Sequence, residues 1–240
     1  MKIFDNLRGK FHLKFKDRQS SGNILGEALK DSIKKQERKN CLVIGIPRGG
    51  IITGYCIAKK LGCRLDLIIL RKLCAPDNEE LAIGAVTEDG NTYINDILVE
   101  ELDITSDYIA REKLTQLKEI ERRTSLYSFN KKTFPSFNDP KLEYKTIILA
   151  DDGIATGATI IAAARSIMSL FNSCQLIIAS PVARKSTVAL LKKENVDHIE
   201  ILTTPADSEF KSVEQYYEDF HQLTDQEVIE IITKSVIEVY

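Results

Sequence analysis

The sequence predicts an α/β fold in which helices cover both faces of a mostly parallel, twisted sheet. Short apolar runs alternate along the chain with longer segments whose apolar residues recur at helical spacing. Most of these runs are continuous, as expected for parallel strands that are buried on both faces. Strands and helices in this alternating order favour right-handed crossovers within one sheet.

The expected elements follow from that alternation. We expect strands in the apolar runs at residues 42–46, 65–70, 146–150, 176–180 and 199–202. We expect helices, where the spacing is helical, at residues 51–61, 104–123, 159–170 and 187–194. Residues 1–240 are assigned to a single domain, with a core at about 41–205 and appended segments at 1–40 and 206–240.

Each appended segment contains a helical pattern. The first has apolar residues at helical spacing, which predict a helix packed on the sheet: Ile24, Leu25, Ala28, Leu29 and Ile33. The second begins a helix at Thr224 and Glu227, a capping box, and its apolar face consists of Val228, Ile231, Ile232 and Val236. The two segments are expected to form a small hood.

Two other segments predict loops. Residues 125–145 are rich in Ser, Asn, Lys and Pro, which is typical of a connecting loop. Residues 73–93 contain Pro76, Gly84 and Gly90 around apolar residues, which predicts a loop that opens and closes. Charge runs at residues 30–39 and 118–123 are expected to be solvated helix faces.

Composition limits the classes of function. A chain of 240 residues with 43% hydrophobic residues buries the core of one such domain, and its net charge of −2 argues against broad binding of nucleic acid. The sequence shows no membrane-spanning run and no signal peptide, so we expect a cytoplasmic protein. Neither a disulfide framework nor a zinc site is expected from Cys41, Cys56, Cys63, Cys74, Cys174, His12, His198 and His221, because their spacing fits neither.

The most informative motif is the stretch TIILADDGIATGAT at residues 146–159. It places a loop between a strand and a helix, where open α/β sheets bind ligands. The backbone N–H groups of residues 156–159 lie at a predicted helix start, which favours a phosphate. Gly157 allows close approach of the anion and a positive φ. The motif therefore predicts a phosphate-binding loop.

Asp151 and Asp152 are difficult to explain by structure alone. Two adjacent carboxylates at a buried strand end repel each other and lose hydration. The vicinal hydroxyls of a sugar, or a hydrated cation, would compensate for this cost. The alternative is that one aspartate caps the following helix while the other is solvated.

Residues 147–159 resemble the signature of type I phosphoribosyltransferases, which consists of four apolar residues, two acidic residues and a Thr-Gly-x-Thr loop. The resemblance implies that Asp151 and Asp152 bind the ribose hydroxyls of 5-phosphoribosyl 1-pyrophosphate (PRPP). It implies that the remaining loop binds the 5′-phosphate, through Gly153, Ala155, Thr156, Gly157, Ala158 and Thr159. Residues 41–50, 65–72 and 79–86 resemble a subgroup of this family whose acceptor is unassigned.

Three cations complete the expected site. Arg48 and Gly49 follow a strand and precede a helix, and their guanidinium and N–H groups suit a pyrophosphate. Arg71 and Lys72 follow the next expected strand and would neutralise phosphate oxygens at the same edge of the sheet. The alternative for Arg48 is a turn with a solvated arginine. The alternative for Arg71 and Lys72 is that they flank a strand as charges that favour solubility.

The resemblance implies a Mg²⁺-dependent transfer of the phosphoribosyl group from PRPP to a nitrogenous base or similar acceptor, with release of pyrophosphate. Asp151 and Asp152 would orient the ribose, near a Mg²⁺ ion that is held by PRPP and water rather than by the protein. Arg48 and Lys72 would stabilise the leaving group. Residues 73–93 would close over PRPP. Homodimers are common in the family, and the sequence leaves the oligomeric state open.

The acceptor is not named by the sequence. Relatives that act on 6-oxopurines tend to have an aspartate where this chain has Ala155, which argues against hypoxanthine or guanine. The hood would place an aromatic ring near the base, with candidates among residues 203–205, Phe210, Tyr216 and Tyr217, although aromatic residues at such spacing are more often in the core.

Two other functions compete with a transferase. A non-catalytic protein that binds PRPP or a nucleotide and regulates a partner would keep the same donor site. A phosphohydrolase of the haloacid dehalogenase type needs one residue between its two aspartates, whereas Asp151 and Asp152 are adjacent. The second alternative is therefore disfavoured.

Overall fold

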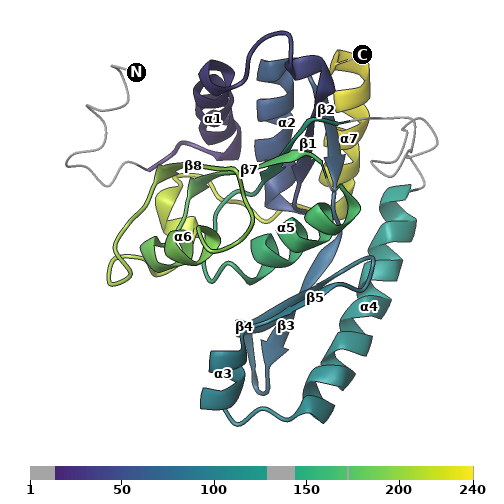
Figure 1. Ribbon diagram of the computed structural model, residues 1–240, viewed down its shortest axis with the longest axis vertical. Coiled ribbons are helices and arrows are strands. Elements are labelled where there is room, and N and C mark those ends of the chain that lie inside the picture. Colours follow the sequence, from purple (N-terminus) through teal and green to yellow (C-terminus); the bar gives the residue numbers. More distant parts are fainter. Residues whose placement is uncertain (1–13, 129–143, 172, 240) are drawn as a thin grey trace.

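The computed structural model describes residues 14–128, 144–171 and 173–239, and its centre is a parallel sheet (Figure 1). The five strands lie in the order β2-β1-β6-β7-β8, and every pairing among them is parallel. Their bounds are β1 Cys41–Gly45, β2 Arg64–Leu67, β6 Thr146–Ala150, β7 Gln175–Val182 and β8 His198–Thr203. The predicted mostly parallel sheet is confirmed.

Helices cover both faces of this sheet, as predicted (Figure 1). One face packs against α1 Arg18–Ser32, α2 Gly49–Leu61 and α7 Asp225–Val239. The other packs against α5 Ala158–Leu170 and α6 Lys185–Leu191. Successive residues of a strand point to opposite faces, so Val43 and Ile148 contact the first group of helices while Ile44 and Leu149 contact the second.

A second, antiparallel sheet extends beyond the parallel one in Figure 1. It consists of β3 Leu70–Ala75, β4 Asn78–Thr87 and β5 Thr92–Ile94, and it is accompanied by α3 Asp96–Glu101 and α4 Ser106–Ser128. The prediction of a loop at residues 73–93 is therefore wrong, because these residues form most of this sheet. Their apolar side chains, such as Leu73 and Ile83, are fully buried in a core shared with α4 and α7.

The prediction of a single strand at residues 65–70 is also wrong. The chain leaves the parallel sheet after Leu67 and enters the antiparallel sheet at Leu70. The apolar run is continuous because Leu67 and Ile69 are both buried in the core between the two sheets. Arg71 and Lys72 consequently lie inside β3 rather than at the end of a parallel strand.

The remaining expected helices agree with the structure apart from their ends. Helices α2, α5 and α6 lie at the predicted positions. Helix α4 continues to Ser128, so the first residues of the expected 125–145 loop are helical, and residues 129–143 lie outside the described residues. Helix α3 has no predicted counterpart.

The two terminal segments pack on the molecule and on each other. Leu25, Leu29 and Ile33 are buried as predicted, whereas Ile24 is exposed. The predicted capping box is confirmed: the Thr224 N–H donates to Glu227 Oε2 at 2.7 Å, and the Glu227 N–H donates to Thr224 Oγ1 at 3.2 Å. Val228 and Ile232 are buried, and the Val236 side chain lies outside the described part.

Phe15 and Tyr217 join the two segments. They form an isolated parallel bridge, with a hydrogen bond of 2.7 Å from the Phe15 N–H to the Tyr216 carbonyl. Their rings pack with those of Phe210 and Tyr216 against Val182 at the end of β7. This aromatic cluster is the hood that the sequence predicts, and it lies over the carboxyl end of the parallel sheet.

Cys41, Cys56 and Cys63 are buried thiols, and burial raises the pKa of Cys56 to about 11. Among the described residues, none of the helices combines the length and the apolar composition that crossing a membrane would require. His12 lies outside the described residues, and His198 is an exposed residue that pairs with Glu200.

Candidate functional site

The candidate site lies where the strand order reverses. From β1 the chain crosses to β2 on one side, whereas from β6 it proceeds to β7 and β8 on the other. In an open α/β sheet, ligands bind in the crevice at the carboxyl ends of the two strands that flank such a point. The loops that follow β1 and β6 both end in a helix, α2 and α5, so two helix N-termini face this crevice.

Glycines bring the two loops into contact. A Cβ at Gly50 would lie 2.7 Å from the Ala150 carbonyl oxygen and 2.9 Å from the Asp151 Cα. A Cβ at Gly49 would overlap the Asp152 carboxylate. Both contacts are closer than a real Cβ tolerates. The β1 loop therefore rests directly on the acidic pair because residues 49 and 50 have no side chain.

The loop at residues 153–159 ends at the N-terminus of α5. Gly157 has φ 85°, in the left-handed region, and a Cβ there would lie 2.7 Å from Thr187 Cγ2. The first turn of α5 is closed by the Ile161 N–H, which donates to the Gly157 carbonyl at 2.9 Å, and the Ala158 N–H approaches Thr156 Oγ1 at 3.5 Å. The N–H groups ahead of Ile161 have no carbonyl within the helix, which suits an anion.

Gly153 and Ala155 line the side of this loop that faces the hood. A Cβ at Gly153 would overlap the Val213 side chain. The Ala155 methyl packs on the aromatic cluster of the hood, and its carbonyl accepts a 2.5 Å hydrogen bond from Thr187 Oγ1. An aspartate at residue 155 would place its carboxylate against apolar rings, so the methyl group fits the packing of this chain.

A cavity of about 960 Å³ opens beside the two loops. Its walls contain Thr159 from α5, Arg48 from the β1 loop, Arg71 and Lys72 from β3, and several polar residues of α4. The structure thus brings together all three predicted cations, although two of them come from the antiparallel sheet. A volume in this range accommodates a small organic ligand.

The three cations differ in their surroundings. Arg71 is half-buried and its Nε donates to Gln116 Oε1 at 2.9 Å; burial lowers the pKa of this guanidinium. Lys72 is exposed, and Arg48 is half-buried at the start of α2. Within the described ranges, neither Arg48 nor Lys72 forms an ion pair with a carboxylate, so both are open to an anionic ligand.

Asp151 and Asp152 lie side by side at the end of β6, as predicted. The Asp152 N–H donates to Asp151 Oδ1 at 2.9 Å. Burial, together with the neighbouring Asp152 charge, raises the pKa of Asp151 well above its usual range, and Lys72 partly opposes this shift. The Asp152 carboxylate has a cationic partner, because Arg18 Nε donates to its Oδ2 at 2.6 Å.

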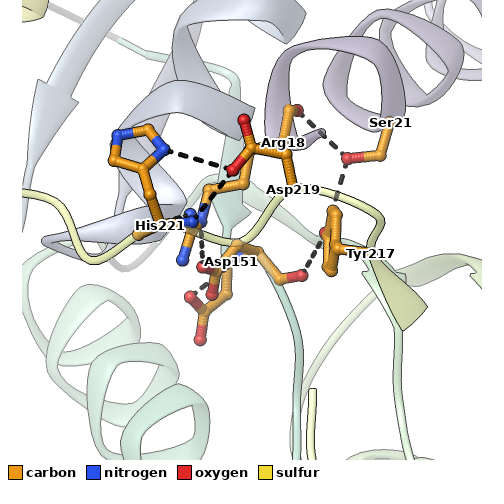
Figure 2. A network of polar contacts seen from close by, with 7 residues as sticks. Arg18, Ser21, Asp151, Tyr217, Asp219 and His221 are labelled. Atoms are coloured by element: carbon orange, nitrogen blue, oxygen red, sulfur yellow. Dashed lines mark hydrogen bonds and ion pairs between the residues drawn. The ribbon is translucent and has the colours of Figure 1, made fainter. Parts of the chain in front are cut away.

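Arg18 is a residue of the site that the sequence does not reveal (Figure 2). It is the first residue of α1 and it reaches a carboxylate 134 positions further along the chain. Its sequence neighbours explain only the helix start, where Asp17 and Ser20 form a capping box. No local spacing in the sequence marks such a long-range pair, which forms only in the tertiary structure.

The hood aromatics have a structural role. Phe210, Tyr216 and Tyr217 are 4%, 6% and 2% exposed and pack against one another and against Phe15. Their rings occupy the core of the hood, which is the alternative that the sequence favoured over stacking on a base. Tyr217 also contacts the site through its hydroxyl, which donates to the Asp152 carbonyl at 2.6 Å.

The acidic residues bear on how Mg²⁺ would be held. Among the described residues there is no group of three or more His, Cys, Asp or Glu side chains that could form a metal site. Mg²⁺ usually keeps several waters and is bound by one or two carboxylates together with substrate phosphates. Because these residues provide only an adjacent pair of aspartates beside a cationic cavity, they suit an ion that keeps its waters and arrives on the phosphates of a substrate, near Asp151 and Asp152.

Comparisons with known proteins agree with this geometry. A family model described as "Phosphoribosyl transferase domain" matches residues 14–219. Two proteins of Mycobacterium tuberculosis, "Putative phosphoribosyl transferase Rv0571c" (strain H37Rv) and "Putative phosphoribosyl transferase MT0597" (strain CDC 1551), are each 31% identical over 221 residues, or 92% of this chain. Because the match covers 47% of those proteins, the chain spans about half the length of the curated relatives it matches.

A solved structure is similar to this chain in both sequence and fold. The crystal structure of TT1426 from Thermus thermophilus is 30% identical and superimposes with a TM-score of 0.69. The match covers 92% of this chain and 99% of that one. The parallel sheet, the two loops at its switch point and the family match over residues 14–219 lead to one conclusion: this chain belongs to the phosphoribosyl transferase domain family.

Proposed function

We propose that the protein is a Mg²⁺-dependent phosphoribosyltransferase that transfers the 5-phosphoribosyl group of PRPP to a nitrogenous base or similar acceptor and releases pyrophosphate. The observation that carries the proposal is the meeting of three features at one crevice. These are an acidic pair, a helix N-terminus and a cavity lined by cations. A ribose with a phosphate at one end and a pyrophosphate at the other matches all three.

Each part of the donor has a proposed partner. The 5′-phosphate binds at the start of α5, where the N–H groups of residues 156–159 and the Thr159 hydroxyl surround it. The ribose hydroxyls bind Asp151 and Asp152. The pyrophosphate lies in the cavity, on the N-terminus of α2 and beside Arg48, Arg71 and Lys72.

In the transfer, the bond between the anomeric carbon and the pyrophosphate oxygen breaks, and a bond to an acceptor nitrogen forms. Negative charge grows on the departing pyrophosphate, and Arg48 and Lys72 stabilise it. Positive charge grows on the ribose ring, which the neighbouring carboxylates of residues 151 and 152 hold in place and stabilise. When bound, Mg²⁺ would neutralise part of the charge on the pyrophosphate oxygens.

Ala155 bears on the proton that the acceptor nitrogen loses. Its methyl group accepts no proton, so residue 155 does not serve as a general base in this chain. A base of the 6-oxopurine type, whose enzymes tend to have an aspartate here, is therefore a poor candidate for the acceptor. This same residue keeps the regulatory alternative in view, because a protein that only binds PRPP needs no general base.

The proposal is tested by mixing the protein with PRPP, Mg²⁺ and a panel of purine, pyrimidine and pyridine bases, and by measuring the release of pyrophosphate. Release that depends on one acceptor and on Mg²⁺ is the expected result. Tight PRPP binding without release from any acceptor would contradict the transferase and favour the non-catalytic PRPP-binding protein.

Replacing Lys72 with methionine should weaken PRPP binding about tenfold, because one charged contact to the pyrophosphate is lost at an exposed position. Binding of ribose 5-phosphate, which lacks the pyrophosphate, should change little. Titration calorimetry with both ligands measures the difference. Lys192→Met is the matched control, since Lys192 is an exposed lysine at the end of α6, away from the cavity. Equal losses for the two ligands would contradict the assignment of Lys72.

A further inference from the structure

Arg18 connects the N-terminal helix to the acidic pair. Its side chain is 6% exposed, and its Nε donates to Asp152 Oδ2 at 2.6 Å. Its Nη1 donates to the His221 carbonyl at 2.9 Å, and its guanidinium carbon lies 3.7 Å from the centre of the Phe220 ring. One contact to the loop after β6 and two contacts to adjacent residues of the C-terminal segment therefore hold the guanidinium in place.

Asp152 is held from several sides as well. Its carbonyl accepts a 2.6 Å hydrogen bond from the Tyr217 hydroxyl, which also approaches Ser21 Oγ of α1 at 3.4 Å. Its N–H donates to Asp151 Oδ1. Both terminal segments thus converge on a single residue of the ribose-binding loop.

The ion pair also touches the loop after β1. A Cβ at Gly49 would lie 2.9 Å from Arg18 Nε and would overlap the Asp152 carboxylate. The pair therefore lies between the two loops that the proposed function assigns to ribose and pyrophosphate. Any movement of the Arg18 side chain would change its contacts with both loops.

Stability gives a weak reason for an ion pair at this position. The cost of desolvating two buried charges offsets most of their attraction, and apolar side chains would hold the segments together equally well. The neighbouring aromatic cluster around Tyr217 already does so. What an arginine adds is a fixed positive charge and a directed hydrogen bond at one oxygen of Asp152.

We propose that Arg18 is a positioning residue for the donor: it binds Asp152 Oδ2, places a fixed positive charge beside this carboxylate, and leaves its second oxygen and Asp151 for the ribose hydroxyls. The inference rests on the proposed function, because the donor is PRPP. Arg18 acts through Asp152 and does not itself contact the donor. The hood, which holds Arg18 through Phe220 and His221, thereby sets the geometry of the ribose site.

The charges around the pair make the role measurable. Three groups contact Asp152: Arg18 of α1, Asp151 of the same loop and the Tyr217 hydroxyl of the C-terminal segment. Lys72 of β3 acts electrostatically on Asp151. Burial raises the pKa of Tyr217, so this hydroxyl stays neutral, and the pKa of Asp151 is also raised. Arg18 is the cation in direct contact with the acidic pair, and losing its positive charge would raise the pH at which the pair loses its protons.

The test is the pH dependence of PRPP binding in the presence of Mg²⁺, measured by calorimetry for the unsubstituted protein, Arg18→Gln and Arg18→Lys. We expect Arg18→Gln to weaken binding about tenfold near neutral pH and to move the midpoint of the acidic limb upward by about one pH unit. Arg18→Lys keeps the positive charge, so its pH midpoint should lie close to that of the unsubstituted protein. In the unliganded protein, NMR titration of the aspartate carboxyl carbons should show an upward movement of the Asp151 midpoint in Arg18→Gln.

Arg165 provides a matched control, because it pairs with Glu194 at 2.9 and 2.8 Å and lies 5.0 Å from the Tyr93 ring, yet does not line the donor cavity. Arg165→Gln should leave the pH midpoint unchanged. If Arg18→Gln lowers PRPP affinity equally at every pH and leaves the titration midpoint of the carboxyl group unchanged, Arg18 only stabilises the structure, and the inference is overturned. Failure of the unsubstituted protein to bind PRPP would overturn the proposed function and this role together.

Discussion

Replacing Asp151 and Asp152 together with asparagine should weaken PRPP binding at least about 100-fold while the fold is retained. Each carboxylate is expected to accept a hydrogen bond from a ribose hydroxyl, and such bonds to charged groups contribute about 1.5–3 kcal/mol each. The single variants should differ. The pKa of Asp151 is raised by burial and by the Asp152 charge, which makes this group more like a neutral amide, whereas Asp152 binds Arg18 Nε at 2.6 Å, so Asp152→Asn should cost more.

Titration calorimetry with PRPP and Mg²⁺ measures this loss, and circular dichroism verifies the fold. Asp197→Asn is the control, because Asp197 caps the amino end of β7 through the Leu176 N–H at 2.8 Å, at the opposite edge of the sheet. Its PRPP affinity should match that of the unsubstituted protein. Unchanged binding in the double variant would show that the acidic pair does not contact the ribose.

The second large effect is expected for Gly49→Ala. The added methyl group would overlap the Asp152 carboxylate and lie 2.9 Å from Arg18 Nε, so the loop after β1 and the acidic pair would be forced apart. We expect PRPP affinity to fall more than about tenfold and the free energy of unfolding to fall by about 1–3 kcal/mol, the usual cost of overpacking a buried contact.

Gly54→Ala is the matched control, since Gly54 lies further along the same helix. Its Cβ would meet the end of the Leu65 side chain first, at 3.1 Å, and alanine favours a helix over glycine. Urea unfolding and PRPP titration of both variants separate the two effects. Equal behaviour of Gly49→Ala and Gly54→Ala would contradict the close contact between the two loops.

The sequence predicts the parallel sheet and the β6 loop well because their signals are local. A continuous apolar run such as residues 147–150 marks a buried strand, and the two aspartates and the Thr-Gly-x-Thr turn that follow it are contiguous. Parallel strands also have their carboxyl ends at one edge of a sheet, so the motif and Arg48 were expected to meet. The structure brings them together at the predicted place.

The antiparallel sheet was not predicted because its signals conflict. Residues 73–93 contain turn-forming residues such as Pro76 and Gly90, and the apolar run at 65–70 passes from one sheet to the next without a break. Lys72 reaches the cavity all the same, from β3 rather than from the end of a parallel strand. The expectation about this residue's place in the fold was wrong, and its proposed role as a ligand contact remains a prediction.

Arg18 was missed for a different reason. The residues around Arg18 in the sequence indicate only that a helix begins there. Its partner Asp152 belongs to the motif at residues 146–159, which contains no sign of a contact with the N-terminal segment. Long-range pairs between a terminal segment and a loop leave no periodic pattern in a single sequence. The contacts among Phe15, Phe210 and Tyr217 in the hood likewise join distant segments and arise only on folding.

A crystal structure of the protein with PRPP and Mg²⁺ tests the account most directly. It should show the ribose hydroxyls within hydrogen-bonding distance of Asp151 and Asp152, and the 5′-phosphate at the N-terminus of α5. The pyrophosphate should lie in the cavity beside Arg48 and Lys72. PRPP bound elsewhere, or bound with its ribose turned away from the acidic pair, would contradict the assignment of this crevice as the donor site.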